Sequence, residues 1–291
     1  MAPNATLETL HVPIFDINSL MPDATILILG KRRSGKSILL KDIFYHHRQI
    51  PSGVIFSGTE TATPFFSEFI PDSFIYNKYD ANIINKLINR QKIKVNAARE
   101  KRLGVDGKTG DNNIFIVLDD MQAESETWKN DETIKNIFFN GRHYNIFFML
   151  SLQYSMGITA SLRGNVDYVF VFNEPSYKNK KKIYEDYGSI IPSFDQWCNI
   201  MDACTENFGC LVIKTSGKSS ISWYKAEIHK SFKVSKNIMW EYHRKHYNQN
   251  HNNETILKES ELIKIKEKYK NSRKLKVIVS KDSGEILNIT K

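Results

Sequence analysis

Eight consecutive residues, Gly30 to Ser37, read GKRRSGKS, and few folds have a place for such a sequence. They match the Walker A pattern G-x-x-x-x-G-K-[ST], in which glycines let successive backbone N–H groups point at phosphate oxygens. An apolar run at 24–29 precedes the motif and predicts a strand, and the apolar residues 38–40 begin a predicted helix after it. Because both neighbours are of the kind that such a loop requires, we interpret the motif as a phosphate-binding loop and not as a chance Gly/Lys turn.

The loop predicts roles for its polar side chains. Lys36 can reach the β- and γ-phosphates of a nucleotide, and Ser37 can offer its hydroxyl to Mg²⁺. The helix that follows turns the positive end of its dipole toward the same anion. We therefore expect ATP and Mg²⁺ as cofactors. The expected nucleotide-binding residues are Gly30, Arg33, Ser34, Gly35, Lys36, Ser37 and Ile38.

A second motif, IFIVLDD at 114–120, is a continuous apolar run that ends in two carboxylates. Such a run is typical of a buried parallel strand, and an acidic strand end is the usual partner of a phosphate-binding loop. We assign Asp119 to holding Mg²⁺ opposite Ser37, and Asp120 to activating the attacking water as general base. Many hydrolysing P-loop enzymes carry Glu at the second position, so Glu124 stays open as an alternative base. A capped turn after a strand is the structural alternative for the acidic pair.

The interval between the two motifs has room for a further strand near residue 54 and a long helix. This spacing favours the branch of P-loop ATPases in which another strand lies between the loop strand and the acidic strand. In that branch the central strand often ends in a polar sensor residue. Here the apolar run 146–150 continues to Gln153, so we expect Gln153 to contact the γ-phosphate or the attacking water. An ordinary polar strand end is the alternative.

Two arginines stand just before predicted strands, Arg142 in NGRH and Arg163 in LRGN. Oligomeric ATPases supply an arginine across a subunit boundary to neutralise charge in the transition state. Arg142 is our first choice for this role in trans, and Arg163 is the alternative. Arg32 and Arg33, inside the loop, could act within one subunit or contact a neighbour. Each arginine alone could equally be a surface or ion-paired residue.

Four motifs occur in order along the chain: GKRRSGKS, IVLDDMQ, NGRHYNIFFMLSLQ and LRGNVDYVFVF. This series resembles the poxvirus-type DNA-packaging ATPases of nucleocytoplasmic large DNA viruses, which belong to the FtsK–HerA superfamily. The resemblance covers roughly residues 20 to 215. It implies a RecA-like core, a ring-shaped homo-oligomer and ATP-driven translocation of double-stranded DNA into a capsid. It further implies a capsid, portal or membrane-vertex partner, and a location in the host cytoplasm at the viral assembly site or in the virion.

The pattern of elements predicts an α/β fold, a P-loop core with a mainly parallel sheet and helices on both faces. We divide the chain into an N-terminal lead-in at 1–23, an ATPase domain at 24–230 and a basic appendage at 231–291. The predicted strands are 24–29, 54–56, 114–118, 146–150, 168–172, 210–213 and 221–224. The predicted helices are 37–47, 82–102, 133–139, 176–187, 193–204 and 254–273, with a short turn within 61–72, a linker at 247–253 and a hairpin at 277–287.

Basic charge is unevenly distributed along the chain. Residues 225–291 hold 16 Lys and Arg against 8 Asp and Glu, whereas the rest of the chain is nearly neutral. A basic appendage suggests a polyanionic partner, nucleic acid first, although a solvated Lys-rich tail would have the same composition. The basic stretch 86–102, the Gly-rich loop 104–113 with Lys108, and the tail are the candidate DNA-facing parts.

Other sequence signals narrow the class of protein. No apolar run approaches the roughly 20 residues of a membrane span, and no secretory signal is visible. Three cysteines at six-residue spacing suggest reduced thiols and not a metal site. The alternatives to a DNA motor are a helicase, a protein- or RNA-remodelling ATPase, a small-molecule kinase, and a nucleotide-binding switch or structural protein that scarcely hydrolyses ATP.

Overall fold

The computed structural model describes residues 10–102, 112–154 and 158–250 of the 291-residue chain. By its contacts the chain divides into two compact units, Met1–Tyr247 and Asn248–Lys291. The first unit thus takes in residues 231–247, which the sequence-based division placed in the appendage. The predicted helix at 254–273, the predicted hairpin at 277–287 and most of the predicted loop at 104–113 lie outside the described residues.

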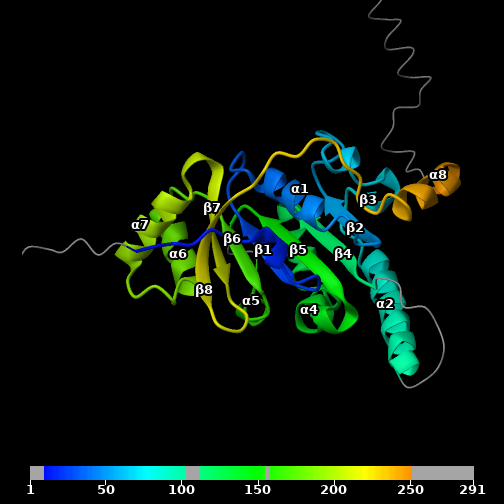
Figure 1. Ribbon diagram of the computed structural model, residues 1–291, viewed down its shortest axis with the longest axis horizontal. Helices are drawn as coiled ribbons and strands as arrows, with labels where there is room; N and C mark the ends of the chain where they lie inside the picture. Colours follow the sequence, from blue (N-terminus) through cyan, green and yellow to red (C-terminus); the bar gives the residue numbers. More distant parts are fainter. Residues whose placement is uncertain (1–9, 103–111, 155–157, 251–291) are drawn as a thin grey trace, which may run out of the picture. The chain divides into compact units, whose positions relative to one another are not determined.

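A mostly parallel β-sheet runs through the first unit (Figure 1). Within the described residues the strand order is β3-β2-β4-β5-β1-β6-β7-β8, and every pairing from β3 to β6 is parallel. The hairpin β7–β8 adds two antiparallel strands at one edge. The strands are β1 Thr25–Leu29, β2 Ser52–Ser57, β3 Ile75–Tyr76, β4 Ile114–Asp119, β5 Ile146–Leu152, β6 Tyr168–Val171, β7 Gly209–Lys214 and β8 Ser220–Lys225.

Strands β1, β4 and β5 form the centre of the sheet, and every one of their residues is buried. Because both faces of these strands are covered, their sequences are continuous apolar runs and do not alternate with polar residues. β5 pairs with β4 on one side and with β1 on the other, which confirms the predicted strand between the loop strand and the acidic strand. The predicted α/β class with a mainly parallel sheet is likewise confirmed.

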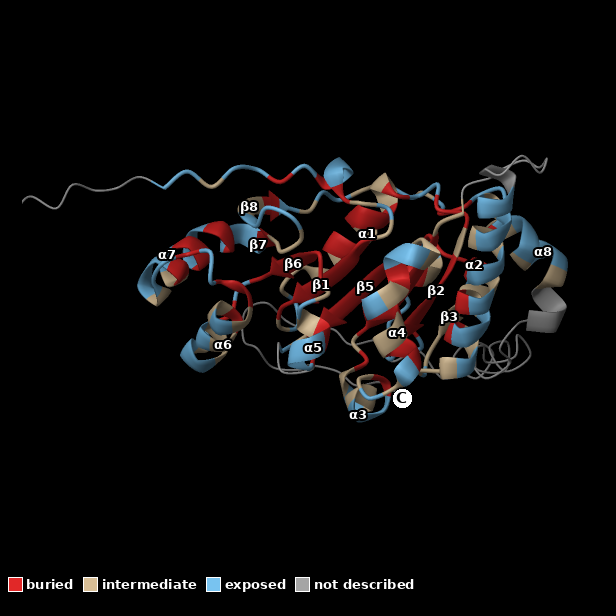
Figure 2. Ribbon diagram, turned by 90° about the horizontal axis from the view of Figure 1, so that it is seen from below, coloured by how far each residue is buried: buried red, intermediate tan, exposed pale blue. Residues whose placement is uncertain are grey.

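Helices pack on both faces of the sheet, each face over its own apolar core (Figure 2). Successive residues of β4 point to opposite faces, so Ile116 and Leu118 join the core under α2, α4, α6 and α7. Phe115 and Val117 join the other core, under α1 and the start of α8. The helices are α1 Lys36–His46, α2 Ala81–Arg102, α3 Ser125–Trp128, α4 Glu132–Asn140, α5 Ala160–Arg163, α6 Tyr177–Tyr187, α7 Phe194–Cys204 and α8 Met239–Asn250.

Two features lie outside the centre of the sheet. Ser216 and Gly217 lie in the turn between β7 and β8, and Gly217 has a φ of +69°, which glycine adopts without steric cost. The predicted linker at 247–253 is wrong for residues 247–250, which are the last turn of α8. Polar residues dominate α8, and its buried anchor is Met239 at the first position, so the sequence shows no apolar period there.

Two further features concern membrane-spanning helices and cysteines. Among the described residues, no helix combines the length and the apolar character needed to cross a membrane. The three cysteines are free thiols, Cys204 and Cys210 buried and Cys198 half-buried.

Close packing between β2 and β4 yields a stability prediction. Gly53 is buried opposite Phe115, and a Cβ atom at Gly53 would lie 2.4 Å from both the Phe115 ring and its carbonyl oxygen. We therefore expect Gly53→Ala to lower the free energy of unfolding by about 1–3 kcal/mol, measured by chemical denaturation. At Gly164 the nearest atom to an added Cβ is 4.0 Å away, so Gly164→Ala is the matched control and should change stability little. Equal effects of the two substitutions would contradict this packing.

Candidate nucleotide-binding and hydrolysis site

The phosphate-binding loop joins β1 to α1, as its sequence predicts. β1 ends at Leu29 and α1 begins at Lys36. A Cβ atom at Gly30 would lie 2.6 Å from the Ser34 hydroxyl oxygen and 2.8 Å from Cβ of Phe172, so the loop closes only around glycine. Gly35 has a φ of +112°, a backbone conformation that side chains disfavour. Both glycines of the motif are therefore required by the fold of the loop itself.

Lys36 lies between the loop and the acidic strand end. Its Nζ atom donates hydrogen bonds to the carbonyl oxygens of Gly30, at 2.5 Å, and Lys31, at 3.1 Å. Burial lowers the pKa of Lys36, while the nearby carboxylates of Asp119 and Asp120 raise it. Lys36 of the phosphate-binding loop and the two carboxylates at the end of β4 are therefore close enough for their charges to interact.

Asp119 is the last residue of β4 and is 6% exposed. In the sheet register it is opposite Ser57 of β2 and Ser151 of β5. Burial raises the pKa of Asp119 to about 6, helped by the charges of Asp120 and Glu60, while Ser151 and Lys36 act in the opposite direction. Because burial disfavours the charged form of Asp119, a cation that neutralises this charge should bind strongly. Together with the exposed Ser37 hydroxyl it offers the oxygen donors that Mg²⁺ prefers, so these residues fit that ion.

Asp120 and Gln153 are brought into direct contact. The Gln153 Nε2 atom donates a hydrogen bond of 2.7 Å to Oδ1 of Asp120, which links the ends of β4 and β5. Asp120 has a φ of +50°, in the left-handed region that a non-glycine residue enters at a cost in backbone energy. The alternative base, Glu124, is engaged elsewhere, because its Oε2 atom accepts a hydrogen bond of 3.0 Å from the backbone N–H of Tyr79. Asp120 thus lies at the joined ends of β4 and β5, whereas Glu124 is bonded to the segment before α2.

Glu60 is a site residue that the sequence analysis missed. It follows β2 and is 7% exposed, and its carboxylate accepts hydrogen bonds from the backbone N–H groups of Phe65, Phe66 and Ser67. Its charge contributes to the raised pKa of Asp119. The sequence did contain a signal for Glu60. It is an acidic residue shortly after a predicted strand, and the carboxyl ends of parallel strands lie at one edge of the sheet.

The arginines proposed for action in trans lie away from this edge. Arg142 belongs to the turn directly before β5, so it is at the amino ends of the strands, and its Nη2 atom is 3.0 Å from Oδ1 of the fully buried Asp167. Arg163 closes α5, where it pairs with Asp186 at 3.2 Å and donates to the carbonyl of Ile158. Arg32 and Arg33 are exposed in the loop. The structure thus does not bring Arg142 or Arg163 to the nucleotide site of their own subunit.

A pocket of about 410 Å³ opens beside the loop. Six of the seven predicted nucleotide-binding residues line it, all except Gly30, and the opposite wall was not foreseen. That wall includes Phe208 and Ile228, which are 67% and 87% exposed. Asn207 and Phe208 have consecutive positive φ angles of 50° and 66°, a strained pair next to the pocket. An apolar wall next to a phosphate-binding loop can hold the base of a nucleotide.

Sequence comparisons relate the chain to proteins of large DNA viruses. The family model of the poxvirus A32 protein matches residues 13–191. An uncharacterized protein of Acanthamoeba polyphaga mimivirus is 32% identical over 239 residues, which are 80% of this chain and 83% of that protein. An uncharacterized protein of Invertebrate iridescent virus 6 is 34% identical over 223 residues, covering 72% of this chain and 81% of that protein.

Solved structures share the fold. The genome packaging NTPase B204 from Sulfolobus turreted icosahedral virus 2, in complex with sulfate, aligns over 72% of this chain and 99% of its own, with a TM-score of 0.51 and 15% identity. The DNA-packaging ATPase B204 from Sulfolobus Turreted Icosahedral Virus aligns over 72% of this chain and 100% of its own, with a TM-score of 0.50 and 19% identity. At these identities the likeness concerns the fold alone.

The buried charge of Asp119 gives a pH-dependent prediction. Its folded-state pKa of about 6 exceeds the ordinary 3.8, so the folded chain binds this proton more tightly than the unfolded chain. The carboxyl therefore destabilises the fold increasingly as the pH rises through this interval. In metal-free buffer at pH 7, we expect Asp119→Asn to raise the free energy of unfolding by about 1–3 kcal/mol, with the gain vanishing toward pH 4.

Chemical denaturation across that pH range, with a chelator present, measures the effect. The matched control is Asp195→Asn, at an exposed position in the first turn of α7, where no gain is expected. An Asp119→Asn protein that is less stable than wild type at pH 7 would show that the carboxylate is not held at a cost.

Proposed function

The chain belongs to the family of the poxvirus A32 protein, and on that premise we propose that it is an ATPase that packages a viral genome by moving double-stranded DNA. One observation carries the proposal above the others. The parallel sheet gathers the phosphate-binding loop, the acidic end of β4 and Gln153 after β5 at a single edge. One of the solved structures that share this fold is a genome packaging NTPase in complex with sulfate, an anion of phosphate-like shape.

The geometry supports a distinct role for each side chain in hydrolysis. Lys36 and the loop N–H groups bind the β- and γ-phosphates, and Asp120 accepts a proton from the water that attacks the γ-phosphorus. The bond to the bridging oxygen then breaks, and ADP and phosphate leave. Gln153 donates a hydrogen bond to Asp120, which supports its proposed role as the residue that senses the γ-phosphate. Mg²⁺, held by Ser37 and Asp119, would neutralise negative charge on the phosphates.

A ring of subunits would complete the site. In the proposed homo-oligomer, Arg142 remains the first candidate for the arginine that acts on a neighbour's nucleotide, with Arg163 as the second. Arg142 is 54% exposed in its side chain, so it is accessible to a neighbouring subunit, although it also neutralises the buried Asp167. If Arg142 moved to the nucleotide of a neighbouring subunit, the buried carboxylate of Asp167 would lose its ion-pair partner. The role in trans therefore requires a compensating change at Asp167.

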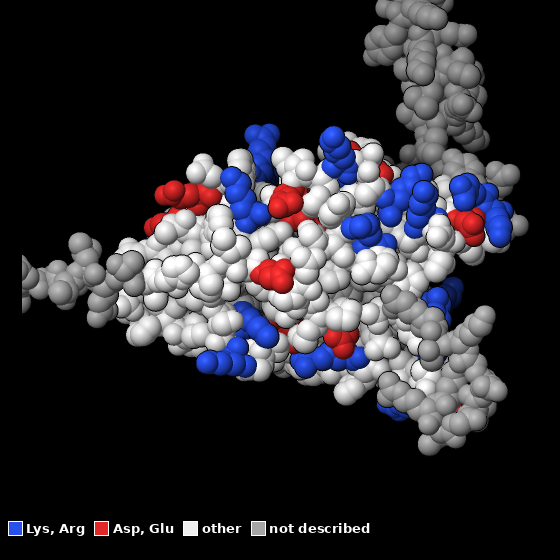
Figure 3. All heavy atoms as spheres, in the orientation of Figure 1, with Lys and Arg blue, Asp and Glu red and all other residues white. Residues whose placement is uncertain are grey.

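DNA would be bound through its phosphates and with little sequence preference. Exposed basic residues on α2, among them Lys86, Lys92 and Arg99, are candidate contacts. On the face seen in Figure 3, basic and acidic side chains are interspersed and do not form one continuous basic patch. A capsid or portal partner, and a place at the viral assembly site in the host cytoplasm or in the virion, belong to the same proposal.

Steady-state ATP hydrolysis with and without long duplex DNA tests the function. We expect duplex DNA to stimulate hydrolysis, the stimulation to weaken as salt rises, and Lys36→Ala to abolish turnover. Hydrolysis that is indifferent to DNA would contradict the motor and favour a protein-remodelling ATPase. ATP binding without hydrolysis would instead favour a nucleotide-binding switch, an alternative that the short Asp120 side chain at the base position keeps open.

A pair of substitutions tests the base. Asp120→Asn keeps an oxygen for the Gln153 hydrogen bond but cannot accept the proton, so we expect kcat to fall by about 10²–10⁴ while ATP affinity is retained. Glu124→Gln is the comparison, since its carboxylate already accepts the Tyr79 N–H, and turnover should stay within a few-fold of wild type. The reverse result, with turnover lost in Glu124→Gln only, would transfer the role to Glu124.

A further inference from the structure

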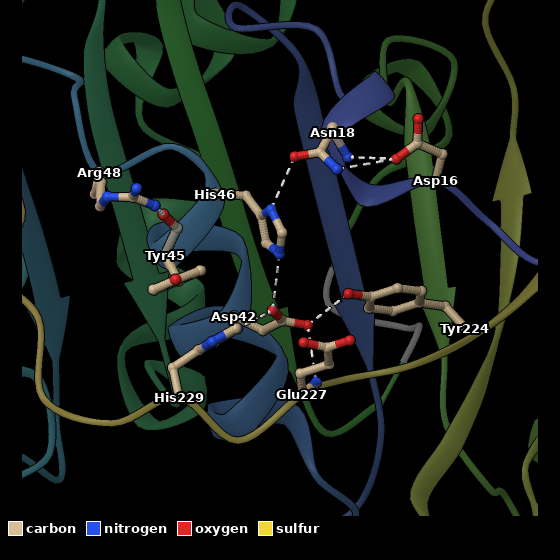
Figure 4. Close-up of polar contacts among 9 residues, drawn as sticks. All are labelled: Asp16, Asn18, Asp42, Tyr45, His46, Arg48, Tyr224, Glu227 and His229. Atoms are coloured by element: carbon tan, nitrogen blue, oxygen red, sulfur yellow. Dashed lines mark hydrogen bonds and ion pairs between the residues drawn. The ribbon is translucent and has the colours of Figure 1, made fainter.

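Three metal-ligating side chains converge on α1, outside the nucleotide site (Figure 4). Asp42 and His46 lie one turn apart on α1, and His229 comes from the segment that follows β8. Their nearest ligand atoms all lie within 4.8 Å of one another. The Nε2 atoms of His229 and His46 are 2.6 Å and 3.5 Å from the same carboxylate oxygen, Oδ1 of the fully buried Asp42.

The hydrogen bonds around His46 fix which of its nitrogens carries a proton. The Asn18 amide nitrogen donates to the Asp16 carboxylate at 3.2 Å, so the oxygen of the same amide faces His46. Nδ1 of His46, 2.8 Å from that oxygen, must therefore be the donor. In the neutral ring this leaves an unprotonated Nε2 facing Oδ1 of Asp42. Either a proton or a metal cation can satisfy these two acceptors, and the nearby His229 nitrogen supplies the third ligand that a metal would use.

Other groups hold Oδ2 of Asp42, so Oδ1, which His229 Nε2 contacts at 2.6 Å, is the carboxylate oxygen that faces both histidines. Oδ2 accepts hydrogen bonds from the Tyr224 hydroxyl, at 2.6 Å, and from the backbone N–H of Glu227, at 3.1 Å. The His229 ring is stacked on Tyr45, with 3.7 Å between centroids and 8° between planes. Each ligand is thus oriented by a second group, and the Asn18 bond to the remote nitrogen of His46 is the arrangement usual for metal-bound histidine.

We propose that Asp42, His46 and His229 bind a divalent cation of the zinc class. Two imidazoles and one carboxylate suit Zn²⁺, which takes tetrahedral sets of nitrogen and oxygen ligands, and they are poor ligands for Ca²⁺ or Mg²⁺. Solvent reaches the side chains of His46 and His229, which are 21% and 10% exposed, so water can complete the set. The assignment is independent of the proposed function.

The position of the site gives it a structural consequence for the nucleotide pocket. The segment 226–229 alternates: Ala226 and Ile228 line the pocket, whereas Glu227 and His229 are bonded to Asp42. Lys36 and Ser37, at the start of α1, line the opposite side of the same pocket. A cation at Asp42 would therefore link the segment 226–229, which forms part of the apolar wall, to α1, which carries Lys36 and Ser37.

Equilibrium dialysis of the purified full chain against Zn²⁺ tests the site, with nucleotide absent and millimolar Mg²⁺ present to occupy the hydrolysis site. We expect one Zn²⁺ per wild-type chain, and at least about tenfold weaker binding in His46→Gln and in His229→Gln. Asn18→Ala removes none of the three ligands, only the Asn18 side-chain bonds to His46 and Asp16, and affinity should fall by about 10–100-fold. His11→Gln, at an exposed histidine away from the cluster, is the matched control and should bind like wild type.

Two outcomes would overturn the proposal. Absence of bound Zn²⁺ in the wild type would mean that protons alone occupy the cluster, and equal binding in all variants would place the metal on other histidines or cysteines. Hydrogen exchange of the wild type supplies a test that needs no substitution. Exchange of the Glu227 amide should slow on addition of Zn²⁺, and an unchanged rate at saturating Zn²⁺ would also overturn the site.

Discussion

Parallel pairing of β5 with β1 and β4 decides where the phosphate-binding loop, the acidic end of β4 and Gln153 lie. In this register Leu29 is opposite Leu152, and Asp119 is opposite Ser151, so the phosphate-binding loop, the acidic residues and Gln153 emerge at the same edge. A slip of one residue would turn Asp119 toward the other face of the sheet. The apolar sequences of all three strands, buried on both faces, hold that register. Packing of the core therefore fixes the positions of the site residues at the strand ends.

The same edge concentrates groups that are costly to bury. Asp119 is surrounded by protein, with Asp120 and Glu60 adding negative charge and Lys36 as the nearby cation. Asp120 and Phe208 both adopt positive φ angles, and both lie at the site. Binding of Mg²⁺ would offset the negative charge of these carboxylates, and a nucleotide would fill the pocket. Both would stabilise a site whose charge and backbone conformation are unfavourable, as we expect for a site that binds Mg²⁺ and a triphosphate.

Sequence reasoning reached the parts of the site that depend on local pattern. The loop glycines, the buried strands and the acidic end of β4 are each recognisable within one short segment, and their spacing indicated a strand between the loop strand and the acidic strand. Contacts between distant segments were not recognisable: the pairing of Arg142 with Asp167, the wall formed by Phe208 and Ile228, and the cap that Glu60 provides to residues 65–67. Helix α8 was missed because its apolar contact with the core is confined to its first turn.

The central claim is that one edge of the sheet binds the nucleotide and activates water through Asp120. A crystal structure of the chain with Mg²⁺ and a non-hydrolysable ATP analogue tests it most directly. We expect the phosphates within the loop at 30–37, Mg²⁺ between Ser37 and Asp119, and a water held by Asp120 in line with the γ-phosphate. A triphosphate bound elsewhere, or an ordered attacking water held by Glu124 with Asp120 turned away, would contradict it.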